Sequence, residues 1–357
     1  MCRTPDPLEA MARRHLSSVL LIALVAAACS PSESMPDTTP ASSVTTSAPA
    51  EPIRLEYRYG DGETLRYEVE VGQSIGFRAQ GDAAGLGGTE LPIDADLVTE
   101  SQGTTTYTAR TNSDGQSDLE ISARFPDTRV AGNVNGRTID NLAEGGIEAD
   151  LARIDPVDVV VTVEPTGRIL GAGNPTGVVV GAELAALTGL TSEMFTVPIG
   201  PVLPPNREVG VGDSWETMTS RPGQNGPVAI LATSRIVAST DGLLEIHTTT
   251  VTDGYEVDFS REFRDLFLGF AELEEEGEVP PEVIEQIDSI EFRIVVPETT
   301  TVEQSHFDPG RGVVRRSIKT TGLRLTMVFR SPSETGELTG FEIVFDLTQS
   351  ATFTLID

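Results

Sequence analysis

The chain has 357 residues, and its 55 acidic against 25 basic side chains give a net charge of −30. A field of this sign repels phosphate backbones and anionic lipid surfaces, which excludes nucleic acid as an expected partner. Cys2 and Cys29 are too few for a disulfide framework or a cysteine-based zinc site. A folded part must therefore be stabilised by its hydrophobic core, and the chain is long enough to form one.

The N-terminus has the pattern of a signal peptide. Three cationic residues, 13–15, precede an apolar run over 16–28. As a helix this run spans about 20 Å at roughly 1.5 Å per residue, whereas a bilayer core needs about 30 Å. We therefore predict a signal peptide over 1–28, with Met11 as a candidate true start because residues 1–10 are unlike a cationic leader.

The end of this segment resembles the bacterial lipobox, since Ala26-Ala27-Ala28 is followed directly by Cys29. The resemblance implies cleavage before Cys29 and its acylation, palmitate included, and a place on the extracytoplasmic face of the cell membrane. Two acyl chains give a stable anchor where one does not. The lipobox usually has a large aliphatic residue where this chain has Ala26. The alternative is ordinary cleavage after Ala28, which leaves a secreted protein without lipid.

Residues 29–52 follow as a segment rich in Ser, Thr and Pro, with no aromatic residue. Such a segment cannot bury enough apolar surface to offset the entropy cost of ordering. We predict a disordered stalk that holds the folded part away from the membrane.

From residue 53 onward, apolar and polar residues alternate as in half-buried strands. The alternation is clear over 53–59 and 65–71, and it returns near the C-terminus over 341–347 and 351–356. Turn signals such as Asp241-Gly242 separate these runs. The pattern predicts a mainly β protein built from antiparallel sheet.

Three short motifs recur in the same order, which predicts two similar halves over 53–200 and 207–357. Gly62-Glu-Thr-Leu65 is echoed by Gly212-Asp-Ser-Trp215. The run 107–121 is echoed by 235–246, and 163–169 is echoed by 307–313. The proline-rich run 197–206 is the expected hinge between the halves.

Each half also contains a segment with helical spacing, 178–195 in the first and 259–273 in the second, and 282–290 suggests a further short helix. The expected fold is two halves of curved antiparallel sheet, each with a covering helix. Apolar residues of the second segment form one stripe: Phe259, Phe263, Leu266, Phe267 and Phe270. They either line a cavity for an apolar ligand or pack as ordinary core.

Candidate catalytic and metal-binding residues carry little support. Gly72-Gln-Ser74-Ile-Gly76 matches the nucleophile elbow of α/β-hydrolases, but it continues a β alternation with no helix after it. His247 and His306 lack the spacing of a zinc site, and the acidic run 272–278 lacks the pattern of a calcium loop. We therefore predict no catalytic residues, no metal and no cofactor, and we interpret both histidines as strand or surface residues.

The leader, stalk and acidic β-rich part together resemble uncharacterised lipoproteins of actinobacterial type, with 209–215 and 306–309 as the shared short motifs. A more distant likeness, at the level of fold alone, is to half-barrel lipoprotein carriers. These resemblances imply an anchored protein that binds or carries an apolar, lipid-like small molecule. An interaction or scaffold lipoprotein that contacts envelope proteins is the alternative, and a hydrolase using Ser74 or His306 is a third hypothesis.

Overall fold

The computed structural model describes residues 52–81, 93–112, 115–140, 157–173, 200–221, 223–261, 264, 268, 284, 287–332 and 338–356. The predicted signal peptide, Cys29 and all of the stalk except Pro52 lie outside these residues. The described strands are, in chain order, β1 (Ile53–Arg54), β2 (Thr64–Gly81), β3 (Ile93–Thr111), β4 (Ser117–Val134), β5 (Arg137–Asp140), β6 (Val157–Val163), β7 (Ile169–Gly173), β8 (Glu208–Val209), β9 (Ser214–Arg221), β10 (Val228–Thr240), β11 (Leu243–Thr252), β12 (Tyr255–Asp258), β13 (Glu291–Val296), β14 (Thr299–Asp308), β15 (Val313–Pro332) and β16 (Leu338–Ile356).

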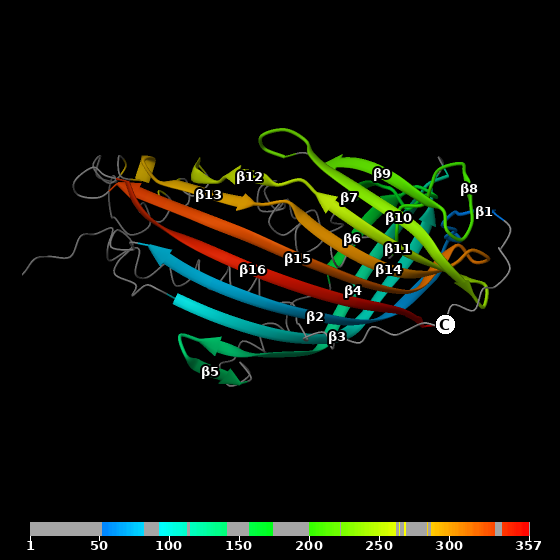
Figure 1. Ribbon diagram of the computed structural model, residues 1–357, viewed down its shortest axis with the longest axis horizontal. Helices are drawn as coiled ribbons and strands as arrows, with labels where there is room; N and C mark the ends of the chain where they lie inside the picture. The colour runs from blue at the N-terminus through cyan, green and yellow to red at the C-terminus, as the bar shows by residue number, and fades with distance from the viewer. Residues whose placement is uncertain are drawn as a thin grey trace, which may run out of the picture.

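Nearly all of these strands join one antiparallel sheet, in the order β7-β6-β4-β3-β2-β16-β15-β14-β11-β10-β9 (Figure 1). The centre of the sheet pairs β2 with β16, so the first long strand of one predicted half lies beside the last strand of the other. Along β15, one end pairs with β14 and the other with β13. Outside the large sheet, β1 and β8 form a short ladder of their own.

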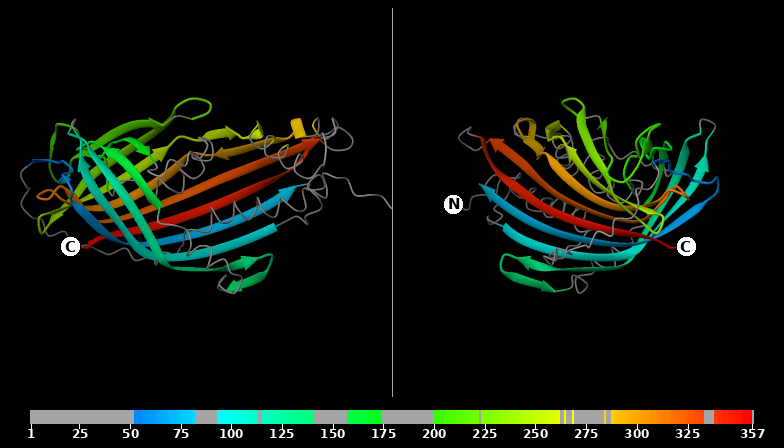
Figure 2. Two further views of the ribbon diagram at one scale, coloured as in Figure 1. Left: turned by 180° about the vertical axis from the view of Figure 1, so that it is seen from behind. Right: turned by 45° about the vertical axis from the view of Figure 1, so that its right-hand side comes forward.

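The large sheet is bent into a trough (Figure 2). One core cluster contains Val161 from β6 and Trp215 from β9, although these strands are at or next to opposite edges of the sheet. Figure 2 shows the two sides of the sheet curving toward each other. We call the face that they enclose the inner face and the opposite one the outer face.

Strict alternation along the strands separates the two faces. In β2 every second side chain from Leu65 to Ala79 is buried, and the residues between them are exposed or half-buried. The alternation predicted over 65–71 is confirmed, and the strand is longer than that run. The two runs predicted near the C-terminus belong to a single strand, β16, because their register against β2 is continuous.

The run 53–59 differs from the prediction, since only Ile53 and Arg54 are in a strand. Tyr57 instead donates its backbone N–H to the Pro165 carbonyl, and Arg58 donates to that of Gly312. The run keeps its alternation because Leu55 and Tyr57 are buried. Its backbone, however, is bonded to the turns after β6 and β14 and not to a neighbouring strand.

Two turns that precede long strands are built alike. In the turn before β2, Gly60 donates to the carboxylate of Glu63, and Gly62 donates to the Ala109 carbonyl on β3. In the turn before β9, Gly210 donates to the carboxylate of Asp213, and the N–H of Gly212 bonds the Ile236 carbonyl on β10. Gly62 and Gly212 both have a positive φ, 76° and 97°, which glycine adopts without strain.

The described part of the predicted hinge is packed into the core. Leu203 is fully buried and donates its N–H to the Thr166 carbonyl. The Tyr57 hydroxyl and the Trp215 indole N–H each donate 2.8 Å hydrogen bonds to neighbouring carbonyls of this segment, Pro201 and Val202. This segment therefore links elements of both predicted halves.

Parts of the second predicted helix are described, and Ser260, Arg261, Arg264 and Leu268 are helical. The Asp258 carboxylate accepts hydrogen bonds from the N–H and hydroxyl of Ser260, which fixes the start of the helical segment. In the next predicted helix, over 282–290, the described residues Ile284, Ile287 and Asp288 are helical. The segment 178–195 lies outside the described residues.

Candidate functional site

A band of polar side chains crosses the mostly apolar inner face. Cross-strand partners place its members in two adjoining rows, because directly paired residues point to the same side of a sheet. In the second row, Val71 and Ala351 stand between Ser101 and Lys319. We define the polar band as Ser101, Thr99, Gln73, Gln349, Thr321, Thr301, Lys319, Glu303, Thr248 and Ser234. The band runs from β3 to β10 through the middle strands of the sheet.

Glu303 is the most highly connected residue of the band. It is 5% exposed, and its Oε1 accepts hydrogen bonds from the hydroxyls of Ser305 at 2.7 Å and Ser317 at 2.8 Å. Its Oε2 faces the ammonium of Lys319, its direct partner on β15, at 3.6 Å. Lys319 is the only lysine of the chain. The sheet therefore places a compensated pair of charges on its buried face.

This pair adds little net stability, because removing two charges from water costs about as much as their attraction returns. The two serines offset part of that cost, since hydrogen bonds to a charged acceptor are stronger than neutral ones. Removing one partner alone would leave a buried, uncompensated charge. The pair therefore makes this part of the trough sensitive to substitution without explaining why the fold is stable.

Three neighbouring polar atoms of the band are buried without a hydrogen-bond partner: Oε1 of Gln73, Oγ1 of Thr99 and Nε2 of Gln349. Thr99 and Gln349 are the direct cross-strand neighbours of Gln73 on its two sides. All three residues are at most 2% exposed. A buried unpaired group typically costs about 1–3 kcal/mol, and native proteins keep few of them. Three in a contiguous row indicate a place where a further polar group can bind.

On either side of the band the inner face is mostly apolar. Toward the turn that precedes β2 lies the Tyr67 core, a cluster that includes Tyr67, Val69, Ile246 and Phe307. In the other direction lies the Phe77 cluster, which consists of Ile75, Phe77, Ala79, Ala95, Leu97, Ile343 and Phe345. Beside it is the Val257 cluster of Val257, Phe259, Ile294, Val296 and Leu323. Leu325, Met327 and Leu347 pack against both of the last two clusters and join them.

The tyrosines of the Tyr67 core are suited to packing and not to acid–base chemistry. Burial raises the pKa of the Tyr57, Tyr67 and Tyr107 hydroxyls well above the usual value, so they stay protonated. Tyr67 donates a 2.8 Å hydrogen bond to the Val314 carbonyl and meets the ring of Tyr107 edge-on at 5.5 Å. These groups cannot act as bases near neutral pH.

Of the predicted apolar stripe, only Phe259 is described. It is buried in the Val257 cluster, and its ring centroid is 6.1 Å from that of Phe292. Phe263, Leu266, Phe267 and Phe270 lie outside the described residues, as do Cys29 and the acidic run 272–278. The polar band was not predicted from the sequence, because its members are scattered along the chain and meet only through strand register.

The residues considered for catalysis are distributed as ordinary sheet residues. Gly72 to Gly76 lies within β2 in unbroken register with both neighbouring strands, which confirms that the motif continues a strand, as its β alternation predicts. His247 and His306 lie on β11 and β14, and His247 contacts the carboxylate of Glu245 at 2.7 Å. Within the described ranges, no group of three His, Cys, Asp or Glu side chains is placed to hold a metal ion.

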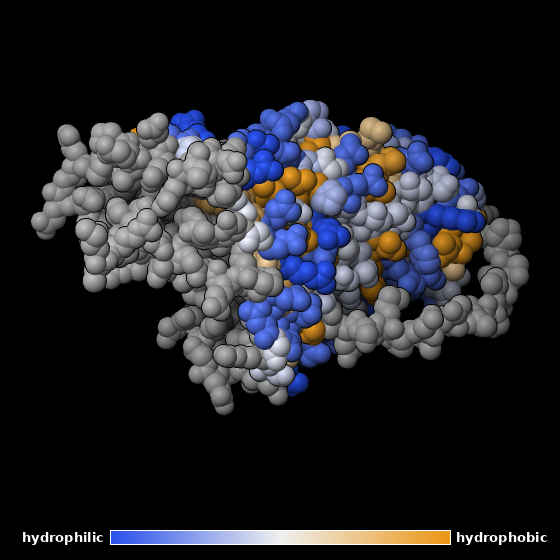
Figure 3. Space-filling model, turned by 60° about the vertical axis from the view of Figure 1, so that its left-hand side comes forward, coloured by the Kyte–Doolittle hydropathy of each residue, from blue (hydrophilic) through white to orange (hydrophobic). Residues whose placement is uncertain are grey.

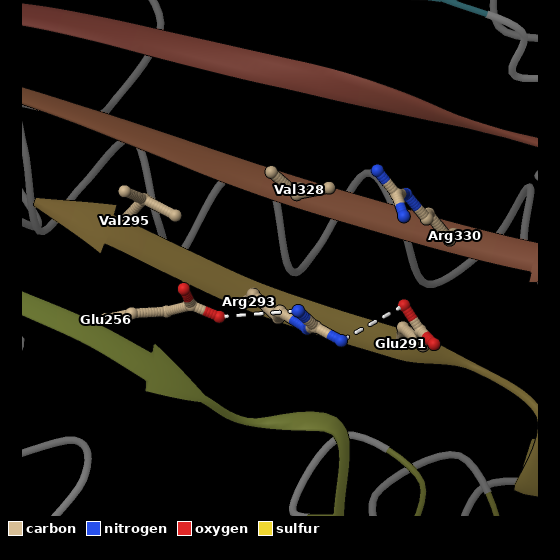
Figure 4. A pocket seen from close by; sticks show the side chains of 6 residues that line it. All are labelled: Glu256, Glu291, Arg293, Val295, Val328 and Arg330. Carbon is tan, nitrogen blue, oxygen red and sulfur yellow. Dashed lines mark hydrogen bonds and ion pairs between the residues drawn. The ribbon is translucent and has the colours of Figure 1, made fainter. Parts of the chain in front are cut away.

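A small pocket lies on the outer face over β12, β13 and β15 (Figure 4). Arg293 stands between Glu256 and Glu291, each 3.5 Å away, with Val295, Val328 and Arg330 as the other lining residues. The pocket has a volume of about 110 Å³. Ligand sites usually measure about 300–1,000 Å³, so this one is too small for most organic ligands.

The surface seen in Figure 3 has small hydrophobic patches separated by hydrophilic residues. Over the described surface as a whole, exposed apolar side chains such as Met218 and Val302 belong to different strands. Scattered exposed apolar residues are normal for a protein surface. The described part of this face therefore does not indicate a large docking surface, and the inner face remains the stronger candidate.

Comparison with known proteins does not assign the chain to a family. No family model matches the chain, and no curated protein matches it. One solved structure, a deltaS2 mutant of the TodX monoaromatic hydrocarbon channel, is 7% identical over 84% of this chain and 91% of that one, with a TM-score of 0.16. A TM-score of this size supports no argument about fold or function. Among the described residues, no helix has the length and apolar character needed to cross a bilayer.

Proposed function

We propose that this chain is an extracytoplasmic lipoprotein, anchored through Cys29, that binds or carries an apolar, lipid-like ligand against the inner face of its sheet. One observation carries the proposal. The inner face joins two apolar clusters to a polar band that holds three buried, unpaired polar atoms. A ligand site typically has this composition, with a mostly apolar lining and a few polar groups that fix orientation.

Native mass spectrometry of the purified chain tests this function. A carrier released gently from membranes should retain bound lipid, seen as discrete added masses that disappear on organic extraction. The extracted protein should then take up an added long-chain hydrocarbon. If the extracted protein takes up no apolar probe, the trough is filled by the chain itself, and the scaffold alternative then gains support.

We also propose that the sheet arose from two similar halves, 53–200 and 207–357, each with a helix across it. The like construction of the turns at Gly60–Glu63 and Gly210–Asp213 supports this proposal, because both use the same hydrogen bonds to an adjoining strand. The hairpin β3–β4 then corresponds to β10–β11, and β6–β7 to β14–β15. Recurring use of one turn in the same place relative to a hairpin is the expected result of duplication.

A further inference from the structure

The charges of the polar band sum to zero. In its two rows, Glu303 and Lys319 are the charged residues, and they face each other at 3.6 Å. The Glu303 side chain is 7% exposed and the Lys319 side chain 16%, so water screens neither charge well. An added carboxylate or phosphate would leave this buried region with a net negative charge beside Glu303. Such a charge is costly in a dry interior, and the chain's net charge of −30 adds to the repulsion.

The hydrogen-bonding capacity left in the band is mixed. Gln349 Nε2 is a donor, Gln73 Oε1 is an acceptor, and the Thr99 hydroxyl can be either. A group that matches all three atoms must offer both an acceptor and a donor. An ester carbonyl next to a hydroxyl satisfies this requirement, and a bare hydrocarbon does not.

Apolar clusters adjoin the band on both sides. In the Tyr67 core, Val69, Ile246 and Phe307 are fully buried. The cluster includes side chains from both sides of the trough. The Phe77 and Val257 clusters continue the inner face on the opposite side and share partners along it. The row of Thr99, Gln73 and Gln349 is followed on the same face by the row of Leu97, Ile75 and Leu347. These residues belong to the Phe77 cluster or pack against it, so an acyl chain bound at the band can lie along this cluster.

We infer that the ligand is an uncharged amphiphile, of the acylglycerol class, whose ester and hydroxyl groups bind Gln73, Gln349 and Thr99. Its acyl chain lies along Phe77 and Phe345. This inference rests on the proposed function, because it names the ligand class for the same inner face. It also explains why the band keeps three unpaired polar atoms: they are the groups that the ligand satisfies.

Calorimetric titration of the full chain carrying Cys29→Ser, which has no acyl chain of its own, tests the ligand class. The probes are a monoacylglycerol, the ionised fatty acid and the hydrocarbon, all of equal chain length, each added below its aggregation concentration after organic extraction of the protein. We expect the monoacylglycerol to bind at least tenfold more tightly than either of the other two, which is the effect of one or two well-placed hydrogen bonds.

Variants locate the site. Gln349→Leu and Gln73→Leu should each weaken monoacylglycerol binding about tenfold and leave hydrocarbon binding unchanged. The matched control is Gln80→Leu, which alters an exposed outer-face residue of the same strand and should change neither affinity. Urea unfolding of each variant establishes that the fold is retained.

The outcomes separate the two proposals. Tighter binding of the ionised fatty acid, or equal binding of all probes with no effect of Gln349→Leu, overturns the inference and leaves the carrier function standing. Failure of every probe to bind overturns the carrier function together with the inference. Selective binding of the monoacylglycerol that depends on Gln349 and Gln73 supports both.

Discussion

Glu303 is the residue on which the polar band depends most, since it accepts hydrogen bonds from Ser305 and Ser317 and faces Lys319. Glu303→Ala leaves an ammonium and two buried hydroxyls without their acceptor. We therefore expect the free energy of unfolding to fall by about 3–5 kcal/mol. The double variant Glu303→Leu/Lys319→Met removes both charges. Its free energy of unfolding should lie within about 2 kcal/mol of the wild-type value. Urea unfolding measures all three proteins.

A suitable control for this comparison is Glu68→Ala, which removes an exposed carboxylate from the outer face of β2. It should change stability by no more than about 0.5 kcal/mol. If the double variant is as unstable as Glu303→Ala, the loss comes from packing at position 303, and the charge-pair explanation is wrong.

At this scale the sequence allows a partial prediction of the site. The alternation that buries Leu65, Tyr67, Val69 and Val71 places Gln73 on the same face, so its burial could be predicted. Its neighbours could not be predicted in this way. Gln349 meets Gln73 only through the pairing of β2 with β16, and register between distant strands depends on the whole sheet.

At the scale of elements, the turns at Gly62 and Gly212 test the proposed duplication. Both glycines have a positive φ, and a Cβ built on either meets nothing within 4 Å. Gly62→Ala and Gly212→Ala should therefore lower the free energy of unfolding by similar amounts, about 1–2 kcal/mol, through backbone strain alone. Thermal or urea unfolding measures the two losses.

The control for the turns is Gly322→Ala, since that glycine also has open space around it and no positive φ is found there. Its effect should be near zero or slightly stabilising. Clearly unequal losses at Gly62 and Gly212 would contradict the equivalence of the turns.

The start of the helical segment at Ser260 gives a pH dependence. The Ser260 hydroxyl and N–H donate to Asp258 and lower the pKa of that carboxyl. A carboxyl whose pKa is lowered in the folded state stabilises the fold at pH values above its unfolded pKa, which is about 3.9. That contribution is lost as the pH falls through the folded pKa. We expect Asp258→Asn to reduce the loss of stability as the pH falls below about 4, measured by urea midpoints.

Ser260→Ala serves as the companion variant, because it removes the hydroxyl donor but keeps the carboxylate. It should also flatten the acid limb of the stability curve, to a smaller extent than Asp258→Asn. An acid limb that is unchanged in both variants would show that Asp258 does not contribute to it.

The presence of a strand could be predicted wherever apolar and polar residues alternate, as in β2 and β16. Their ends were less predictable. Residues 55–59 alternate like a strand, yet their backbone groups bond to turns that come much later in the chain. Alternation records which side chains are buried and not what the backbone pairs with, so it cannot distinguish these two cases.

At the scale of the whole molecule, the single large sheet was only partly predictable. Antiparallel β structure follows from the alternation, but joining both predicted halves through β2 and β16 depends on contacts between the start and the end of the folded part. The trough has the same origin. Its curvature brings side chains of β6 and β9 into one core cluster, and no local sequence pattern records this shared packing.

The function proposed for the trough requires the molecule to stay beside the membrane that supplies its ligand, and this depends on the thiol of Cys29. A folded part with a net charge near −30 has little affinity of its own for an anionic bilayer. Cys29→Ser prevents acylation, so we expect the protein to move from the membrane fraction to the soluble extracytoplasmic fraction. Fractionation with immunodetection measures this shift, and mass spectrometry of the N-terminal peptide identifies the acyl chains.

Two controls distinguish anchoring from folding in this experiment. Ser30→Ala leaves the cysteine intact and should remain in the membrane fraction. Urea unfolding of the released Cys29→Ser protein should match that of the wild type, because residue 29 precedes the first strand by more than twenty residues of chain. If the wild-type protein is recovered in the soluble fraction with an unmodified thiol, the anchor is absent and the carrier must reach its lipid by diffusion.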